Sequence, residues 1–318
     1  ISMMLLILDS KSYISGAQEG IKLCLYTVIP SLFPFFIIGN MLTNRLFGKE
    51  NPLISRILKP LNLPNGSSSL YVLGLISGYP VGAQCVHRAW RDGKLQTEDA
   101  QRLIGICNNA GPGFIFGMTG LLFSDPLIPW LLWIIQIISS YIAGWVFSGK
   151  ALSDSTLKPA KPVTITQALQ NALRSMAVVC GWVILFRIMI YMGNRWVFWI
   201  FSDRVQRIIT AFLELSNGCL DLSKESNELY RFVICSGMLS WGGICVAMQT
   251  VSVCNGLSAR FYFVEKIVQT TVSLLLSYSI YMMIYLHSPI QIILLAIIIV
   301  VYSLFRKISS RNFIKACV

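Results

Sequence analysis

Long stretches without formal charge constrain the fold of this chain more than any other feature. The residues from 267 to 305 contain no Asp, Glu, Lys or Arg, and the same holds for 23–44, 61–87 and 232–259. About 20 apolar residues are enough for a helix to cross a bilayer, and helices satisfy their backbone polar groups internally. The sequence therefore predicts an all-α, polytopic membrane protein.

The composition agrees with this interpretation. Hydrophobic residues make up 55% of the chain and charged residues 13%, against about 25% charge in soluble domains. The net charge is +12, but the basic residues are scattered between apolar segments, which indicates topology signals and headgroup contacts and no binding of nucleic acid. The tail carries Arg306, Lys307, Arg311 and Lys315 without an acid, so we expect the C-terminus in the cytoplasm.

The sequence nearly repeats itself. Residues 61–66 (Leu-Asn-Leu-Pro-Asn-Gly) return as 213–218 (Leu-Glu-Leu-Ser-Asn-Gly), an offset of 213 − 61 = 152. At a second offset of 163, Gly74, Ser77 and Gly93 return as Gly237, Ser240 and Gly256. Paired, broken apolar segments are typical of transporters with internal repeats. We expect a first repeat over 1–149, a linker over 150–163 and a second repeat over 164–318; whether they are inverted or parallel stays open.

The first half predicts interrupted helices. Residues 23–44 contain Pro30 and Pro34 and suggest a kinked or broken span. The range 61–87 suggests a helix that enters the membrane and turns back, as a re-entrant hairpin. Thr97 is expected to cap a helix that runs from Glu98 to Cys107, breaks, and resumes over 114–123.

The remaining ranges predict further spans and two interfacial helices. Spans are expected at 126–149, 164–193 and 232–259, and on both sides of residues 287–289 (His-Ser-Pro) within 267–305. The ranges 45–60 and 195–213 are amphipathic and suit the membrane interface. Residues 1–8 are too short to cross, and they suggest the end of a longer first helix or a buried stub.

Three interruptions carry the predicted binding site: residues 78–82, 108–112 and 240–243. A broken helix offers free amides and a partial positive charge that bind carboxylates, amides orient a polar ligand, and Tyr79 and Trp241 suit a planar ring. The predicted substrate-binding residues are Gly78, Tyr79, Pro80, Gly82, Gln84, Asn108, Asn109, Gly111, Ser240, Trp241, Gly243 and Gln249. The alternative role for the glycines is close helix packing.

Other polar residues suggest support for the site rather than catalysis. Arg187 lies in an apolar stretch and needs a partner or a path to the interface, and Glu214 and Glu265 are candidate partners or proton carriers. The nine cysteines form no CxxC pair and are expected as buried small hydrophobes. No HExxH, GxSxG or Walker motif occurs, so we expect no enzyme, no metal site and no cofactor.

At these motifs the sequence resembles the YlbJ-like sporulation integral membrane proteins, within the nucleoside-recognition or Gate superfamily. The matching segments are 78–83 (Gly-Tyr-Pro-Val-Gly-Ala), 97–103, 108–112 (Asn-Asn-Ala-Gly-Pro), 30–36, and 240–243 with Gln249. The resemblance implies a spore-forming bacterium, re-entrant hairpins, broken helices, and movement of dipicolinate, a small planar dicarboxylate, across a spore membrane. The chain departs from the family at Gln84, where Lys is common, and the lost charge weakens the preference for an anion.

These observations predict a transporter or facilitator of a small polar or anionic solute, with dipicolinate as the solute that the resemblance implies. The alternatives are a structural sporulation membrane protein that recruits partners without transport, and a nucleoside carrier. The expected location is the bacterial cell membrane or the forespore membrane. The expected partners are the solute and the lipid bilayer, and a second copy of the chain or other sporulation membrane proteins stay open.

Overall fold

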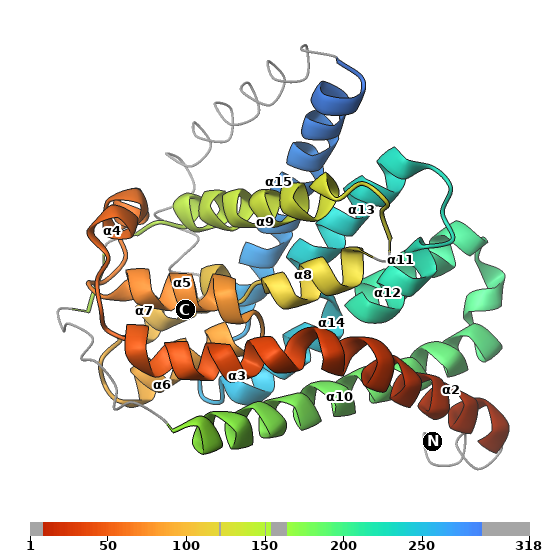
Figure 1. Ribbon diagram of the computed structural model, residues 1–318, viewed down its shortest axis with the longest axis horizontal. Coiled ribbons are helices and arrows are strands. Elements are labelled where there is room, and N and C mark those ends of the chain that lie inside the picture. Colours follow the sequence, from red (N-terminus) through yellow and green to blue (C-terminus); the bar gives the residue numbers. More distant parts are fainter. Residues whose placement is uncertain (1–8, 121, 150, 154–163, 288–318) are drawn as a thin grey trace.

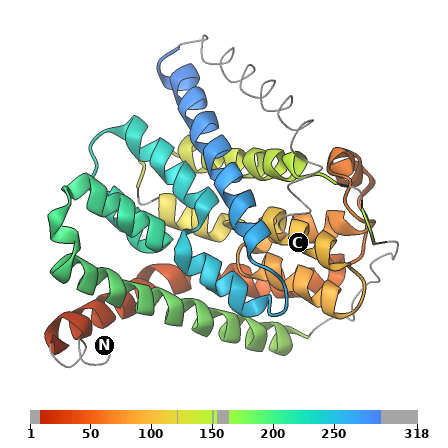
Figure 2. The same cartoon turned by 180° about the vertical axis from the view of Figure 1, so that it is seen from behind.

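The computed structural model describes residues 9–120, 122–149, 151–153 and 164–287 (Figures 1 and 2). Within these ranges the chain forms helices joined by turns and loops, and no strand. The all-α prediction is therefore confirmed for the described part of the chain. Residues 1–8, most of the linker, the second span expected within 267–305, the basic tail and Cys317 lie outside the described residues.

Five helical stretches are long and apolar enough to cross a membrane: Ser10–Thr43, Leu127–Val146, Ile165–Trp196, Glu228–Val253 and Arg260–Tyr285. They correspond to α2 and α3 (Ser10–Leu23 and Ile29–Leu46), α9 (Leu127–Val146), α10 (Ile165–Trp196), α13 and α14 (Glu228–Trp241 and Gly243–Val253), and α15 (Arg260–Tyr285). The spans expected at 126–149, 164–193 and 232–259 are thus confirmed as helices of suitable length. The polytopic membrane character predicted from the charge-free segments follows from them.

Shorter helices fill the space between the long ones. They are α4 (Pro52–Leu58), α5 (Ser67–Ser77), α6 (Val81–Arg91), α7 (Thr97–Cys107), α8 (Pro112–Thr119), α11 (Asp203–Leu213) and α12 (Leu215–Leu222), with 3-10 turns at Lys59–Leu61 and Phe198–Ile200. Helices α5, α6 and α7 have 11 residues each, about 16 Å of length. None of these three helices can cross a 30 Å hydrocarbon core alone.

The first long helix is continuous where the prolines suggested a break. A single π-helical turn, Cys24–Val28, links α2 to α3. Pro30 is the second residue of α3, after Ile29, and Pro34 lies inside α3. A π turn inside an α-helix changes the register of the carbonyls, and proline donates no backbone hydrogen bond to the preceding turn. Of the predicted kinked or broken span, the broken alternative is therefore wrong, and the irregularity that the structure shows is the π turn.

Helices α2 and α10 pack side by side, and α10 runs beneath α2 and α3 in Figure 1. Gly16 and Gly20 of α2 lie directly against α10, where an added Cβ would meet Ile188 and Ile184 backbone atoms at 3.1 and 3.0 Å. Small residues four positions apart allow this approach in membranes. Arg187 of α10 forms an ion pair with Glu19 of α2, so its partner is neither Glu214 nor Glu265.

The two ranges predicted as interfacial helices, 45–60 and 195–213, begin with the last residues of long helices. Helix α3 extends to Leu46 and α10 to Trp196, so each takes over the beginning of the range assigned to an interfacial helix. The rest of the first range forms α4 and the 3-10 turn Lys59–Leu61, and the rest of the second range forms the 3-10 turn Phe198–Ile200 and α11. Large apolar side chains are exposed along the second of these segments: Trp196, Val197, Trp199, Ile200, Phe201, Val205, Ile208 and Phe212.

Thr97 does not cap α7 as predicted. The N-cap is Gln96, without a side-chain cap, and the Thr97 hydroxyl accepts from Trp90 Nε1 at 3.3 Å. Asp99, in the first turn of α7, is fully buried and accepts from the Leu152 and Ser153 amides at 3.0 and 2.8 Å. The carboxylate therefore fixes the chain that leaves α9 against the start of α7.

Candidate functional site

The first two interruptions lie against each other. Helix α5 ends at Ser77, Gly78 adopts φ +74°, and α6 begins at Val81. A Cβ on Gly78 would come within 2.7 Å of the amide nitrogen of Gly111, in the gap between α7 and α8. Both the left-handed backbone and the close approach therefore require glycine at position 78.

The carbonyl of Cys107, at the end of α7, packs between α5 and α6. An added side chain at Gly74 of α5 or at Gly82 of α6 would overlap this carbonyl. Gly82 therefore has the packing role that was the alternative to a binding role. The same contacts place the residues that follow Cys107 beside the α5–α6 turn.

The third interruption separates α13 from α14. Gly242 and Gly243 both have positive φ, +78° and +84°, a conformation that glycine adopts without strain. Helix α13 ends at Trp241 and α14 begins at Gly243. The predicted break is confirmed at this position.

Asn109 is the centre of a buried network that we call the central polar cluster. Its side-chain oxygen accepts from Gln269 Nε2 at 2.9 Å, Lys266 Nζ at 3.1 Å and Gln136 Nε2 at 3.4 Å. Its side-chain nitrogen donates to the Ile106 carbonyl at 2.7 Å and to Ser140 Oγ at 3.2 Å. The members of the cluster are Asn108, Asn109, Gln136, Ser140, Ser240, Thr250, Tyr262, Lys266 and Gln269.

Gln136 of α9 connects the second interruption to the third. Its Nε2 donates toward Asn109 and to the Leu239 carbonyl, 3.3 Å away, while its Oε1 accepts from Ser240 Oγ at 3.4 Å. Asn108 makes a separate connection, because its Nδ2 donates to Thr250 Oγ1 of α14 at 2.7 Å. Breaks that are more than 130 residues apart in the sequence thus meet at one place.

Six members of the cluster are absent from the predicted site residues, and Lys266 is the charged one among them. The charge-free segment begins at Ile267, but α15 begins at Arg260. Lys266 is 2% exposed and its Nζ donates to Asn109 and to Gln269 Oε1, the latter at 2.8 Å. The missed signal is the absence of a helix breaker between Arg260 and Ile267, together with the apolar run Phe261-Tyr262-Phe263.

The structure brings some of the predicted site residues together and separates others. Ten are buried: Gly78, Tyr79, Pro80, Gly82, Asn108, Asn109, Gly111, Ser240, Gly243 and Gln249. Gln84 and Trp241 are half-buried. Of the twelve, only Asn108, Asn109 and Ser240 are members of the central polar cluster.

The two aromatic residues predicted to hold a planar ring have different neighbours. Tyr79 lies 6.4 Å from Phe114, centroid to centroid. Trp241 stacks on Phe212 at 5.0 Å with an interplanar angle of 15°, and its Nε1 donates to the Phe212 carbonyl at 3.1 Å. One face of Trp241 is therefore already covered.

Several buried polar atoms next to the cluster have no hydrogen-bond partner within the described part of the chain. They are Asn108 Oδ1, Gln249 Oε1, the Tyr79 hydroxyl, Ser77 Oγ and both carboxyl oxygens of Glu265. Buried polar groups are normally satisfied by protein or by ordered water. These atoms mark where a water molecule or a polar solute would gain hydrogen bonds.

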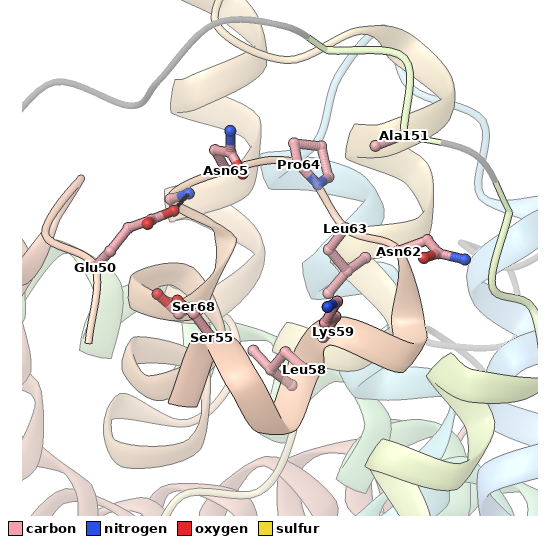
Figure 3. Close-up of a pocket in the computed structure, with 11 residues that line it drawn as sticks. Glu50, Ser55, Leu58, Lys59, Asn62, Leu63, Pro64, Asn65, Ser68 and Ala151 are labelled. Carbon is pink, nitrogen blue, oxygen red and sulfur yellow. Dashed lines mark hydrogen bonds between the residues drawn. The ribbon is translucent and has the colours of Figure 1, made fainter. Parts of the chain in front are cut away.

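A hollow of about 570 Å³ lies elsewhere, at the loop between α4 and α5. Figure 3 shows Glu50 and Asn65 on one side of it and Asn62 and Ala151 on the other. The predicted site residues are absent from its lining. Arg102 of α7 contacts the chain beside it, because Nη2 donates to the Leu61 carbonyl at 2.7 Å and to the carbonyl of Asn62, a lining residue, at 3.5 Å.

The described residues contain no group of three or more His, Cys, Asp or Glu side chains that could hold a metal ion. Eight of the cysteines are described, and all eight are free thiols. Seven of them are buried and Cys180 is half-buried. This agrees with the prediction that cysteines serve as small apolar residues.

Comparison with known proteins gives one distant similarity. The chain is 20% identical over 304 residues to the sporulation integral membrane protein YlbJ of Bacillus subtilis (strain 168), covering 80% of this chain and 74% of that protein. No protein-family model matches the chain, and no solved structure matches it. Together with the five long apolar helices, the similarity identifies an integral membrane protein distantly related to a sporulation protein.

Proposed function

We propose that this protein is a transporter or facilitator of a small polar or anionic solute during spore formation, and that dipicolinate is the solute. The observation that carries the proposal is the hydrogen bond between Asn109 and Lys266, 3.1 Å long and buried. It places an amide from a broken helix beside a lysine from a spanning helix. Polar groups at helix breaks inside a membrane are typical of substrate sites in transporters.

Lys266 supports an anionic solute. An ammonium group has three N–H donors. Lys266 uses two of them, one toward Asn109 Oδ1 and one toward Gln269 Oε1. The third donor is the one that we propose a carboxylate accepts from. In this proposal, Lys266 supplies the positive charge that the resemblance leads us to expect at the position of Gln84.

We also propose that the chain consists of two structural repeats. A glycine with positive φ interrupts each matching pair of helices, Gly78 between α5 and α6 and Gly242 between α13 and α14. Gly93 and Gly256, 163 positions apart, both have positive φ as well, +69° and +91°. In this arrangement α5 and α6 form a re-entrant hairpin, and α13 and α14 form a broken helix.

Uptake of labelled dipicolinate into proteoliposomes that contain the purified protein tests the proposed function. The wild type should accumulate label, while Asn108→Ala, Asn109→Ala and Lys266→Gln should reduce the rate at least tenfold, equivalent to about 1.4 kcal/mol in the barrier. Gly181→Ala is the control, since a Cβ there meets nothing within 4 Å. Normal uptake by both asparagine variants would exclude the central polar cluster as the site.

A structural role without transport is the second candidate, and one observation favours it. Asn108 and Asn109 are each 1% exposed, and both are hydrogen bonded to other helices. If the cluster only fastens helices, the wild type moves no solute and the asparagine variants lose stability alone. A nucleoside carrier is distinguished by competition, because uridine then displaces labelled dipicolinate. Neither candidate involves an enzymatic reaction or a cofactor.

A further inference from the structure

Glu265 is a buried carboxyl group that the proposed site does not use. It belongs to α15 and is 1% exposed. Its side chain lies directly against Gly105 of α7, where a methyl group would overlap the carboxyl group. Gly105 thus leaves the space that the carboxyl group fills between the two helices.

Neither oxygen of Glu265 has a hydrogen-bond partner within the described residues. The adjacent Lys266 does not supply one, because its Nζ donates to Asn109 and Gln269. Neighbouring residues of a helix point about 100° apart, so the carboxyl group lies against Gly105 of α7 while the ammonium reaches Asn109 in the gap after α7. A buried carboxylate without hydrogen bonds is far less stable than the neutral acid.

Four side chains act electrostatically on Glu265, and Arg102, Tyr262 and Lys266 among them have hydrogen-bond partners of their own. They are Arg102 and Cys107 of α7, and Tyr262 and Lys266 of α15. The Arg102 guanidinium is engaged by the Leu61 carbonyl at 2.7 Å and by Asp99 Oδ1 at 3.5 Å. Tyr262 contacts Asn108 Nδ2, which donates to its hydroxyl oxygen at 3.4 Å.

We propose that Glu265 binds one proton within the membrane and that this proton is transported together with the anion. With Glu265 neutral, Lys266 is left as a positive charge that a bound anion can balance. With Glu265 ionised, the adjacent carboxylate balances Lys266 and the anion is released. Proton binding and anion binding therefore favour each other, and the coupling is reciprocal. The transport part of this inference depends on the proposed function, and the protonation of Glu265 does not.

Infrared difference spectroscopy of the full-length protein in lipid tests the proton site without any solute. At neutral pH the wild type should show the carbonyl absorption of a protonated carboxylic acid that Glu265→Gln lacks. Glu265→Asp should shift this absorption, which keeps the test decisive if the Gln variant folds poorly. Glu19→Gln is the matched control, since Glu19 is paired with Arg187, and it should keep the absorption. Identical acid absorption in the wild type and in both Glu265 variants would overturn the proposal.

Uptake driven by a proton gradient tests the coupling, with the membrane potential held at zero. An inward gradient of one pH unit should accumulate dipicolinate about tenfold at equilibrium, because both correspond to about 1.4 kcal/mol. Glu265→Gln should exchange the anion across the membrane but accumulate none. If the wild type moves dipicolinate and the gradient has no effect, the coupling is wrong while the proposed function stands. If the wild type moves none, the proposed function fails, and the infrared result alone decides whether Glu265 holds a proton.

Discussion

The side-chain oxygen of Asn109 lies 2.9 Å from Nε2 of Gln269, although the two residues are 160 positions apart. This contact fastens the gap between α7 and α8 to α15, which crosses the molecule obliquely in Figure 2. An irregular stretch of backbone inside a membrane protein persists only where other protein groups satisfy it. Asn109 therefore holds the shape of the gap.

Replacing Asn109 by alanine should destabilise the protein by about 1–3 kcal/mol, since Lys266, Gln269 and Gln136 all lose an acceptor. Ser140→Ala is the comparison, because Ser140 Oγ accepts from Asn109 alone among the cluster members and donates to the Ile106 carbonyl. Its cost should be about 0.6 kcal/mol, the average for a hydrogen bond between membrane helices. Denaturant titration in detergent micelles measures both. Equal costs would show that Asn109 is not the centre of the network.

Gly105 and Gly181 provide a pair of identical substitutions with opposite expectations. At Gly105 of α7 an added methyl group overlaps the Glu265 carboxyl group, and at Gly181 of α10 it meets nothing within 4 Å. Gly105→Ala should lower stability by about 1–3 kcal/mol, the range for overpacking. Gly181→Ala should leave stability unchanged or raise it by up to about 1 kcal/mol, as Ala favours a helix over Gly. Thermal unfolding followed by circular dichroism distinguishes these outcomes, and equal midpoints would contradict the contact between Gly105 and Glu265.

The breaks and spans could be predicted because their causes are local. Glycine, proline and asparagine at 78–82, 108–112 and 240–243 disfavour a continuous helix whatever surrounds them, and charge-free length predicts the spans. The meeting of the breaks at Gln136 could not be predicted in this way. It depends on how α9 lies between two distant loops, and nothing in its apolar sequence marks Gln136 as a connector.

The errors have equally specific causes. The charge pattern predicts that the last described span starts at Ile267, because Glu265 and Lys266 precede it. Both are buried in the structure, where Glu265 lies against Gly105 and Lys266 donates to Asn109. Thr97 was assigned as a cap from its residue type, but the cap is the residue before it. Pro30 and Pro34 predict a kinked or broken span, but the helix continues past both prolines, with a π turn at Cys24–Val28 before Pro30.

The ion pair between Arg187 and Glu19 should hold α10 against α2. The Arg187 side chain is 17% exposed and that of Glu19 is 44% exposed, so solvent screening limits the attraction. We expect Glu19→Gln to cost about 1 kcal/mol, and Arg187→Glu to cost more because two carboxylates then face each other. The double variant with Glu19→Arg and Arg187→Glu should recover most of the loss. Unfolding in detergent measures the four proteins, and additive losses in the double variant would exclude direct pairing.

Glu214 should make stability depend on pH. It lies between α11 and α12, outside the five long helical stretches, and accepts from the Ser216 and Asn217 amides at 3.0 and 2.7 Å. Burial raises the pKa of this carboxyl group, although these amides lower it in part. The folded protein thus binds the proton more tightly than the unfolded chain. The resulting stability is fully present below the unfolded pKa of about 4.3, and it is lost as the pH rises through the folded pKa.

Glu214→Gln should remove this dependence. As the pH is raised from about 4 to 7, the unfolding midpoint of the wild type should therefore fall relative to that of Glu214→Gln. Glu228→Gln, at an exposed position on α13, controls for the loss of a carboxylate as such. The opposite result is a wild-type midpoint that rises relative to that of Glu214→Gln as the pH increases. It would mean that the hydrogen bonds from Ser216 and Asn217 outweigh burial and that Glu214 caps α12 as an ionised carboxylate.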